Sequence, residues 1–336
     1  MTTIVYVSNA DSGDISVLRM DARTGELTPL SSVAVGGSSG PLALSPDRRF
    51  LYAARRSAPF AAAAFAIDAH SGELTPLGEA ELPASMAYIA TDRSGRHLFG
   101  ASYHEHRVSV SAIGANGVPQ AAHQIVPTEP NAHAVLPDPS NRFVLATSLG
   151  GDIVLQWRFD AATGRLTPND PPAVKVRKGA GPRHVVFHPL KPIVYLLNEL
   201  DASIEVFAFD ADHGTLAPLQ TITAMPAGTT GAPWGADLHL TPDGRFLYSS
   251  ERRSSTLAMF SVDAATGQLT FTGHVPTETQ PRGFNITPDG RFLLVVGQLS
   301  HRLSCCAIDA DSGALAPLKT YAVGQNPHWV EVIDLS

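Results

Sequence analysis

The stretch FDADHGTLAPL at residues 209–219 decides the fold, because variants of it recur along the whole chain. Each copy contains the pattern D-A-x-x-G between short apolar segments. The Asp side chain can hydrogen-bond the backbone of a turn, and Gly supplies the positive φ that closes a bulged hairpin. Each copy therefore predicts two antiparallel strands joined by a tight turn. The other clear copies are MDARTGELTPL (20–30), IDAHSGELTPL (67–77), FDAATGRLTPN (159–169), VDAATGQLTFT (262–272) and IDADSGALAPL (308–318).

The spacing of these copies predicts a ring of seven similar units. Their aspartates stand at positions 21, 68, 160, 210, 263 and 309, and the long step from 68 to 160 contains a degenerate seventh copy, SAIGANGVPQ (111–120). Repeats of roughly 40–50 residues with several short strands are typical of propeller blades. We therefore expect an all-β, seven-bladed β-propeller with four-stranded antiparallel blades, forming a single domain over residues 1–336.

The two ends of the chain are predicted to share one blade. A second recurring phrase, represented by LTPDGRFLYSSER (240–252), marks the turn between the inner two strands of a blade. The C-terminal PHWVEVIDLS (327–336) resembles an innermost strand, and the N-terminal TIVYVSNADSGDISVLRM (3–20) resembles second and third strands. Pairing the ends would close the ring and remove exposed sheet edges. A solenoid, the alternative for such a repeat, needs no shared terminal unit.

Composition excludes several classes of partner. Of the 336 residues 44% are hydrophobic and 16% charged, as in a folded protein with a large core. The net charge of -7 argues against the basic surface that binds nucleic acid. We find no membrane-spanning apolar run and no leader pattern at the N-terminus, and expect a cytoplasmic protein without a membrane partner. The neighbouring Cys305 and Cys306 are predicted to stay reduced and to serve only in packing. The oligomeric state stays open.

Polar side chains are predicted to meet at one mouth of the central channel. The start of each innermost strand lies beside the end of its antiparallel second strand, so both positions face the same rim. The first set contributes His133, Arg183, His184, Asp237, Arg282 and His328, and the second contributes Arg55, His104, Glu199, Arg252 and Gln298. A ring of cations above a narrow channel would concentrate an anionic ligand despite the negative total charge.

The phrases around this rim are those of a known family. GAGPRHVVFHP (179–189), LLNELDASIEVF (196–207), WGADLHLTPDGRFLY (234–248), PTETQPRGFNITPDGRFLL (276–294) and YAVGQNPHWV (321–330) carry the resemblance. The chain resembles the propeller-type bacterial 6-phosphogluconolactonases, which are similar to the fungal carboxymuconate-lactonizing enzymes. The resemblance implies metal-independent opening of a sugar lactone, with 6-phospho-D-glucono-1,5-lactone as the leading substrate, in the pentose phosphate pathway. The family's functional positions correspond to His133, Arg183, Glu199 and Arg252.

These residues suggest a working mechanism. We expect Glu199 or His133 to activate water, Arg183 to stabilise the carbonyl oxygen, and Arg252 and Arg282 to hold the substrate phosphate, since arginine binds phosphate bidentately. Further candidates for substrate binding are Asp237, His328, Gln298, His104 and Arg55. No cofactor or metal is expected, because no compact His or Cys pattern is present.

Structural alternatives accompany these roles. Glu199 and Arg183 could form only a buried ion pair, and His184 could be a structural histidine. Arg55 and Arg56 could be solvated rim charges. Two other functions also remain: a lactonase for a non-phosphorylated aldonolactone or a muconate-lactonizing enzyme, and, more distantly, a non-catalytic interaction platform on the same scaffold.

Overall fold

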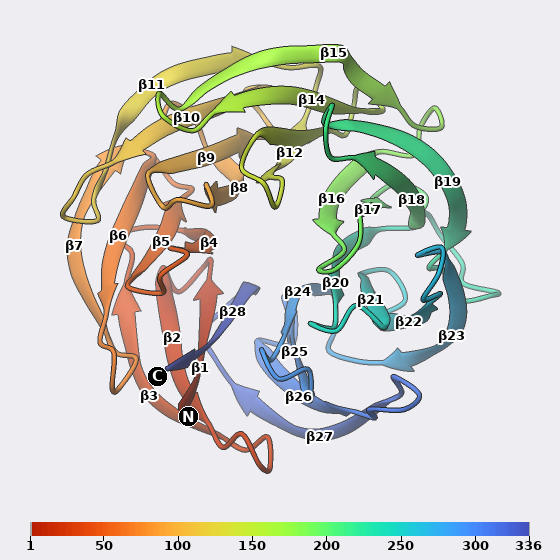
Figure 1. Cartoon of the computed structure of the whole chain (residues 1–336). Helices are drawn as coiled ribbons and strands as arrows, with labels where there is room; N and C mark the ends of the chain where they lie inside the picture. Colours follow the sequence, from red (N-terminus) through yellow and green to blue (C-terminus); the bar gives the residue numbers. More distant parts are fainter. Residues whose placement is uncertain (1, 336) are drawn as a thin grey trace.

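The computed structural model describes residues 2–335, which form seven four-stranded antiparallel sheets arranged in a ring (Figure 1). No helix occurs in this range. The expected seven-bladed propeller is therefore confirmed.

From the innermost strand outward, the first four blades are β28 (Pro327–Leu335), β1 (Thr2–Asn9), β2 (Asp14–Met20), β3 (Leu27–Ala34); β4 (Ser39–Leu44), β5 (Phe50–Arg55), β6 (Ala61–Ile67), β7 (Leu74–Glu81); β8 (Met86–Thr91), β9 (His97–Ser102), β10 (Arg107–Ile113), β11 (Pro119–Pro127); and β12 (Ala132–Pro137), β13 (Phe143–Ser148), β14 (Ile153–Asp160), β15 (Arg165–Lys175).

The remaining three blades have the same plan. They are β16 (Pro182–Phe187), β17 (Ile193–Asn198), β18 (Ser203–Asp210), β19 (Thr215–Thr223); β20 (Gly235–Leu240), β21 (Phe246–Glu251), β22 (Thr256–Val262), β23 (Leu269–Pro276); and β24 (Pro281–Ile286), β25 (Phe292–Gly297), β26 (Arg302–Ile308), β27 (Leu315–Ala322).

The chain ends close the ring as expected. Strand β28 pairs with β1 in antiparallel register, with Val5 opposite Val332 and Val7 opposite Val330. The blade that results has its innermost strand from the C-terminus and its other three from the N-terminus. No blade is therefore left without an inner strand, and the ring has no open seam.

The two recurring phrases contact each other between blades. A Cβ at Gly214, the turn glycine after β18, would overlap the ring of Phe143, which begins β13 in the preceding blade. The same pairing recurs around the ring, for example Gly313 with Phe246 and Gly25 with Phe292. The glycine is thus required both by its φ of +69° and by the side chain packed against it.

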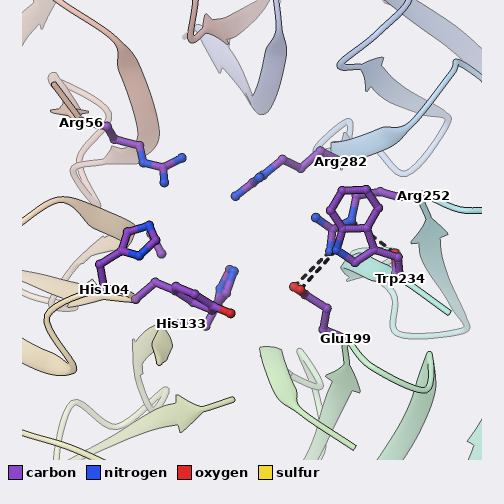
Figure 2. A pocket seen from close by; sticks show the side chains of 9 residues that line it. Arg56, His104, His133, Glu199, Trp234, Arg252 and Arg282 are labelled. Atoms are coloured by element: carbon purple, nitrogen blue, oxygen red, sulfur yellow. Dashed lines mark hydrogen bonds and ion pairs between the residues drawn. The ribbon is translucent and has the colours of Figure 1, made fainter. Parts of the chain in front are cut away.

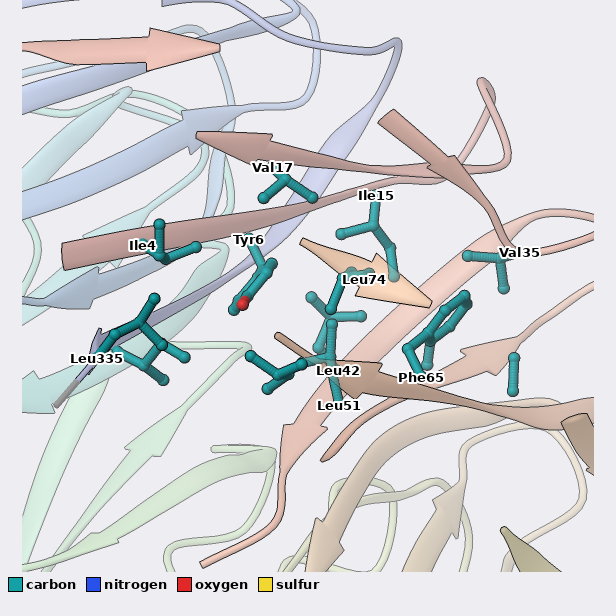
Figure 3. Packing of buried hydrophobic residues seen from close by; sticks show 14 residues of the cluster. Ile4, Tyr6, Ile15, Val17, Val35, Leu42, Leu51, Phe65, Leu74 and Leu335 are labelled. Carbon is teal, nitrogen blue, oxygen red and sulfur yellow. The ribbon is translucent and has the colours of Figure 1, made fainter. Parts of the chain in front are cut away.

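Hydrogen bonds strengthen this contact between blades. The Tyr248 hydroxyl donates to the Gly313 carbonyl at 2.7 Å, and Arg245 donates to the Ala310 carbonyl at 3.0 Å. Apolar clusters fill the space between neighbouring blades; the one formed by the first two blades contains Ile4, Tyr6 and Phe65 (Figure 3). The core is therefore distributed around the ring, which leaves the central channel to polar side chains.

A β-bulge at the start of each innermost strand positions those polar side chains. The register with the second strand shifts between Ala132 and Val135 in one blade, and between Pro182 and His184 in the next. A bulge re-aims the side chains of the extra residues. The residues within the seven register shifts are Gly40 and Pro41, Ala87, His133 and Ala134, Arg183, Ala236 and Asp237, Arg282 and Gly283, and His328.

The contact between Gly214 and Phe143 gives a stability prediction. Gly214→Ala should lower the free energy of unfolding through its positive φ, by about 1 kcal/mol, and through overlap with Phe143, by about 1–3 kcal/mol more. Gly179→Ala is the matched control, because Gly179 has a φ of +77° but no atom near its Cβ position. Urea unfolding of both variants measures the difference, and equal losses would contradict the role of the interblade contact.

Candidate active site

A cavity of about 200 Å³ opens at the predicted mouth of the channel. This volume is below the roughly 300–1,000 Å³ typical of drug-sized ligands, so the cavity suits a small polar molecule. Its walls come from six blades and carry many charged groups (Figure 2). The lining residues are Arg56, Ala87, Tyr103, His104, His133, Glu199, Trp234, Arg252 and Arg282.

Glu199 is the centre of a charged cluster on one side of the cavity. Its Oε2 accepts a hydrogen bond from Arg183 Nε at 2.8 Å and forms an ion pair with Arg252 Nη2 at 3.0 Å. Its Oε1 accepts from Trp234 Nε1 at 3.3 Å. Arg252 also lies against the Trp234 ring, 4.0 Å from its centroid, and donates to the Gly235 carbonyl. These bonds fix the carboxylate at the cavity wall.

The cations around Glu199 keep it ionised. Burial raises the pKa of the Glu199 carboxyl, but Arg183, Arg252 and Arg282 lower it, and the net direction is down. Burial and the neighbouring Arg183 lower the pKa of Arg252 to about 9, which still leaves it charged at neutral pH. The site therefore contains a preformed carboxylate held by two guanidinium groups.

His133 faces the same cavity as a neutral imidazole. Burial and the nearby Arg183, His184 and arginines 282 and 252 lower the pKa of His133 well below its usual range. Its ring lies 5.1 Å from that of His184, and its Nδ1 has no hydrogen-bond partner among the described residues. It can donate or accept one hydrogen bond to a ligand, but a proton on it would add charge to an already cationic site.

A second polar layer lies beneath the cavity. Asp237 Oδ1 is 2.7 Å from His184 Nδ1, and its Oδ2 is 3.3 Å from His239 Nε2. Burial and Arg183 outweigh the attraction of Asp237 and lower the pKa of His184 to about 4, whereas Asp237 raises the pKa of His239 against its burial. Asp237 is thus fully engaged by protein groups.

The cavity brings together six of the predicted residues. Glu199, His133, His104, Arg252 and Arg282 line it, and Arg183 lies directly behind Glu199. Arg183 is only 1% exposed and also donates to the Ala236 carbonyl, so it contacts Glu199 rather than the cavity itself.

Four predicted residues lie outside the lining. Arg55 forms a bidentate ion pair with Glu79, and Asp237 is buried in the layer below. Gln298 bonds to Gln280 and Asn326, and His328 is buried with both ring nitrogens unpaired within residues 2–335. A residue at a strand end points to one side or the other depending on its register, and the sequence alone does not give that register.

Four lining residues were not predicted to bind the substrate, and Arg56 was considered only as a solvated rim charge. Arg56 follows Arg55 at the end of β5 and takes the place expected for its neighbour. Tyr103 precedes the predicted His104, and Ala87 lies within a bulge. Trp234 belongs to the loop before β20, where its backbone nitrogen donates to Glu251 at 2.6 Å. The phrase WGADLHL contained Trp234, but no repeat position pointed to it.

Comparison with known proteins assigns the family. A family model described as "Lactonase, 7-bladed beta-propeller" matches residues 2–332. This chain belongs to that lactonase family. The match confirms the family resemblance and the assignment as a lactone hydrolase.

Individual relatives cover the chain from end to end. It is 43% identical to the 6-phosphogluconolactonase of Pectobacterium carotovorum subsp. carotovorum (strain PC1), over 100% of both chains. Identity to the 6-phosphogluconolactonase of Yersinia pestis (strain Pestoides F) is 41%, over 99% of this chain and 98% of the relative. The structure of the periplasmic gluconolactonase of Pseudomonas aeruginosa superimposes with a TM-score of 0.94 at 30% identity, covering 100% of both chains.

Neither a metal-binding cluster nor a membrane-spanning helix occurs in the part of the lactonase that the structure describes. Across residues 2–335, no group of three or more His, Cys, Asp or Glu side chains is arranged to hold a metal ion. The same residues include no helix long and apolar enough to cross a membrane.

The buried histidines should make the free energy of unfolding depend on pH. Burial, followed by Arg282 and Arg56, lowers the pKa of His328 well below 6.5, so the folded chain resists a proton that the unfolded chain accepts. The free energy of unfolding should therefore fall as the pH drops below about 6.5, by roughly 1.4 kcal/mol per pH unit for each such histidine. Glu331, whose pKa burial raises to about 7, acts in the opposite sense.

A single variant measures how much His328 contributes to this pH dependence. His328→Leu should reduce the loss of unfolding free energy between pH 7 and pH 5 by up to about 2 kcal/mol. Urea unfolding at both pH values measures it, with His70→Leu at an exposed position as the control. An unchanged loss in His328→Leu would show that this imidazole is not held neutral.

Proposed function

We propose that this lactonase hydrolyses 6-phospho-D-glucono-1,5-lactone to 6-phosphogluconate. The observation that supports this substrate is the charge of the cavity: Arg56, Arg252 and Arg282 line it, while Glu199 is its one lining acid. Such an excess of cations in a partly enclosed cavity favours a ligand with more than one negative charge. The names of the Pectobacterium and Yersinia relatives agree with this choice.

The proposed reaction begins with water held between Glu199 and His133. Glu199 is the better proton acceptor, because it is already ionised and its Oε1 accepts only the Trp234 bond. His133 positions the water as a neutral imidazole, since protonation beside the arginines is unfavourable. The water oxygen attacks the lactone carbonyl carbon as its proton passes to Glu199.

Arg252 and Arg183 have different parts in this scheme. Arg252 lines the cavity beside Glu199 and can stabilise the negative charge that develops on the carbonyl oxygen. Arg183 is covered by Glu199 and acts by holding that carboxylate in place. When the bond from the carbonyl carbon to the ring oxygen breaks, the ring oxygen takes up the proton that Glu199 received from water and becomes a hydroxyl. The carboxylic acid formed at the carbonyl carbon releases the second proton of that water to solvent and becomes the product carboxylate.

A non-phosphorylated lactone is the second candidate. The structural similarity to the Pseudomonas aeruginosa gluconolactonase favours it, and that relative is named as periplasmic. For this chain we propose a cytoplasmic role in the pentose phosphate pathway, where a phosphorylated lactone would be formed.

Comparing two substrates tests the proposed function. The specificity constant kcat/KM for 6-phosphogluconolactone should exceed that for gluconolactone by about 10²-fold or more, because charge-assisted bonds to the phosphate are made with only one of them. Acid release in a pH-stat, corrected for spontaneous opening, measures both rates. Equal or inverted constants would favour the non-phosphorylated substrate.

Replacing Glu199 tests the base. Glu199→Gln keeps the shape of the side chain but removes the proton acceptor, so kcat should fall about 10²–10⁴-fold. The melting temperature should also fall, because Arg183 and Arg252 lose their buried counter-charge, so kcat is measured on the folded fraction. A folded variant with full turnover would eliminate Glu199 as the base, and a large drop in melting temperature with normal turnover of the folded fraction would indicate a purely structural ion pair.

A further inference from the structure

Two arginines of the cavity have no partner for their charge. Arg56 follows β5 and Arg282 lies in β24, and their guanidinium groups point toward each other across the opening (Figure 2). Within residues 2–335 neither guanidinium forms an ion pair or a side-chain hydrogen bond, and Arg56 Nε is buried without an acceptor. An arginine that loses water normally gains a carboxylate or carbonyl, so this pair lacks its acceptor.

Arg252, at the other end of the cavity, has the partners that Arg56 and Arg282 lack. Arg252 meets Glu199 and the carbonyl groups of Trp234 and Gly235, so its charge is compensated inside the protein. Burial and the neighbouring cations lower the pKa of both Arg56 and Arg282. Glu199 opposes this shift for Arg252 through a direct ion pair, and for Arg282 without one. The cavity is therefore divided into an end where Glu199 forms direct ion pairs and an end where the two arginines have none.

The fold makes room for the pair and supplies no acid to it. A Cβ at Gly40 would lie 2.7 Å from Arg56 Cγ, so the glycine in the bulge of β4 accommodates the arginine stem. The blade between those of Arg56 and Arg282 presents His328 at the same bulge position. This imidazole is neutral at pH 7, because burial and both arginines lower the pKa of His328. No acidic side chain lines this end of the cavity.

We propose that Arg56 and Arg282 form a binding subsite for a dianionic phosphate monoester, and that this subsite orients the lactone toward Glu199. This inference rests on the proposed function and adds the place in the cavity where the phosphate binds. Two planar guanidinium forks can each bind two phosphate oxygens, and the two positive charges balance the dianion. With the phosphate at this end, the carbonyl lies at the opposite end, beside Arg252 and Glu199. Phosphate held here also keeps its charge away from the carboxylate.

The subsite distinguishes phosphate from carboxylate. A carboxylate carries one negative charge and engages one fork, so a plain sugar acid would leave one arginine unpaired. A phosphate monoester satisfies both, whether it is the substrate's or a free inorganic phosphate. The difference between those two sources is the added contact of the sugar with the Glu199 end.

Binding of the reaction product tests the subsite without catalysis. In calorimetric titrations, Arg56→Gln should weaken binding of 6-phosphogluconate about 10- to 100-fold and weaken gluconate much less. Inorganic phosphate should bind the unaltered protein more weakly than 6-phosphogluconate and lose affinity in the same variant. Arg253→Gln is the charge-matched control, because Arg253 is exposed one residue beyond Arg252 and donates to the Ala232 carbonyl. This control should bind all three probes normally.

Kinetics supply the second measurement. Arg56→Gln and Arg282→Gln should each lower kcat/KM for 6-phosphogluconolactone at least about 10-fold more than for gluconolactone. Equal losses on the two lactones, or unchanged binding of 6-phosphogluconate, would overturn the subsite. If the unaltered protein instead prefers gluconolactone while Arg56→Gln still abolishes binding of 6-phosphogluconate, the proposed function fails and the subsite stands.

Discussion

The contact between each turn glycine and the preceding blade is the constraint on which the rest of the structure depends. The D-A-x-x-G turn of one blade receives the side chain that begins the second strand of the blade before it, as Gly214 receives Phe143. Because the glycine has no Cβ, neighbouring blades approach closely at this point. The interaction repeats around the ring, including across the blade shared by the two termini, where Gly72 meets Ile4. One recurring phrase of the sequence supplies the glycine of this contact, and the other supplies the side chain that packs against it.

Once the ring is fixed, the bulges determine the chemistry of its mouth. Seven equivalent bulges bring seven short segments to one opening, and each blade can carry a different side chain there without altering the fold. Some blades supply small residues such as Gly40 and Ala87, which leave space. Others supply His133, Arg183 and Arg282, which fill it with polar groups. The cavity is therefore assembled from residues distant in sequence, and its charge pattern is independent of the core that holds the blades.

The sequence predicted the ring, its closure and the mouth, because each depends on a periodic signal. It predicted single side chains less well, since a strand end can turn a residue to either side. Arg55 is the last residue of β5 and pairs with Glu79, while Arg56, one position later, faces the cavity. The bulge similarly places Asp237 among His184 and His239 instead of at the mouth. Trp234 lies in a loop outside the repeat, so no period indicated it.

The uneven charge of the cavity places the proposed reaction at one end and the proposed phosphate subsite at the other. Glu199 pairs with both Arg183 and Arg252, so these three side chains hold one another in place without a ligand. Arg56 and Arg282 form no ion pair or side-chain hydrogen bond among the described residues in return for their partial desolvation, which lowers stability. Groups that break the rule of paired burial are expected at functional sites. Under the proposed roles, a lactonase of this family would change its preference between phosphorylated and plain lactones at the arginine pair alone, while the proposed base at the other end stays the same.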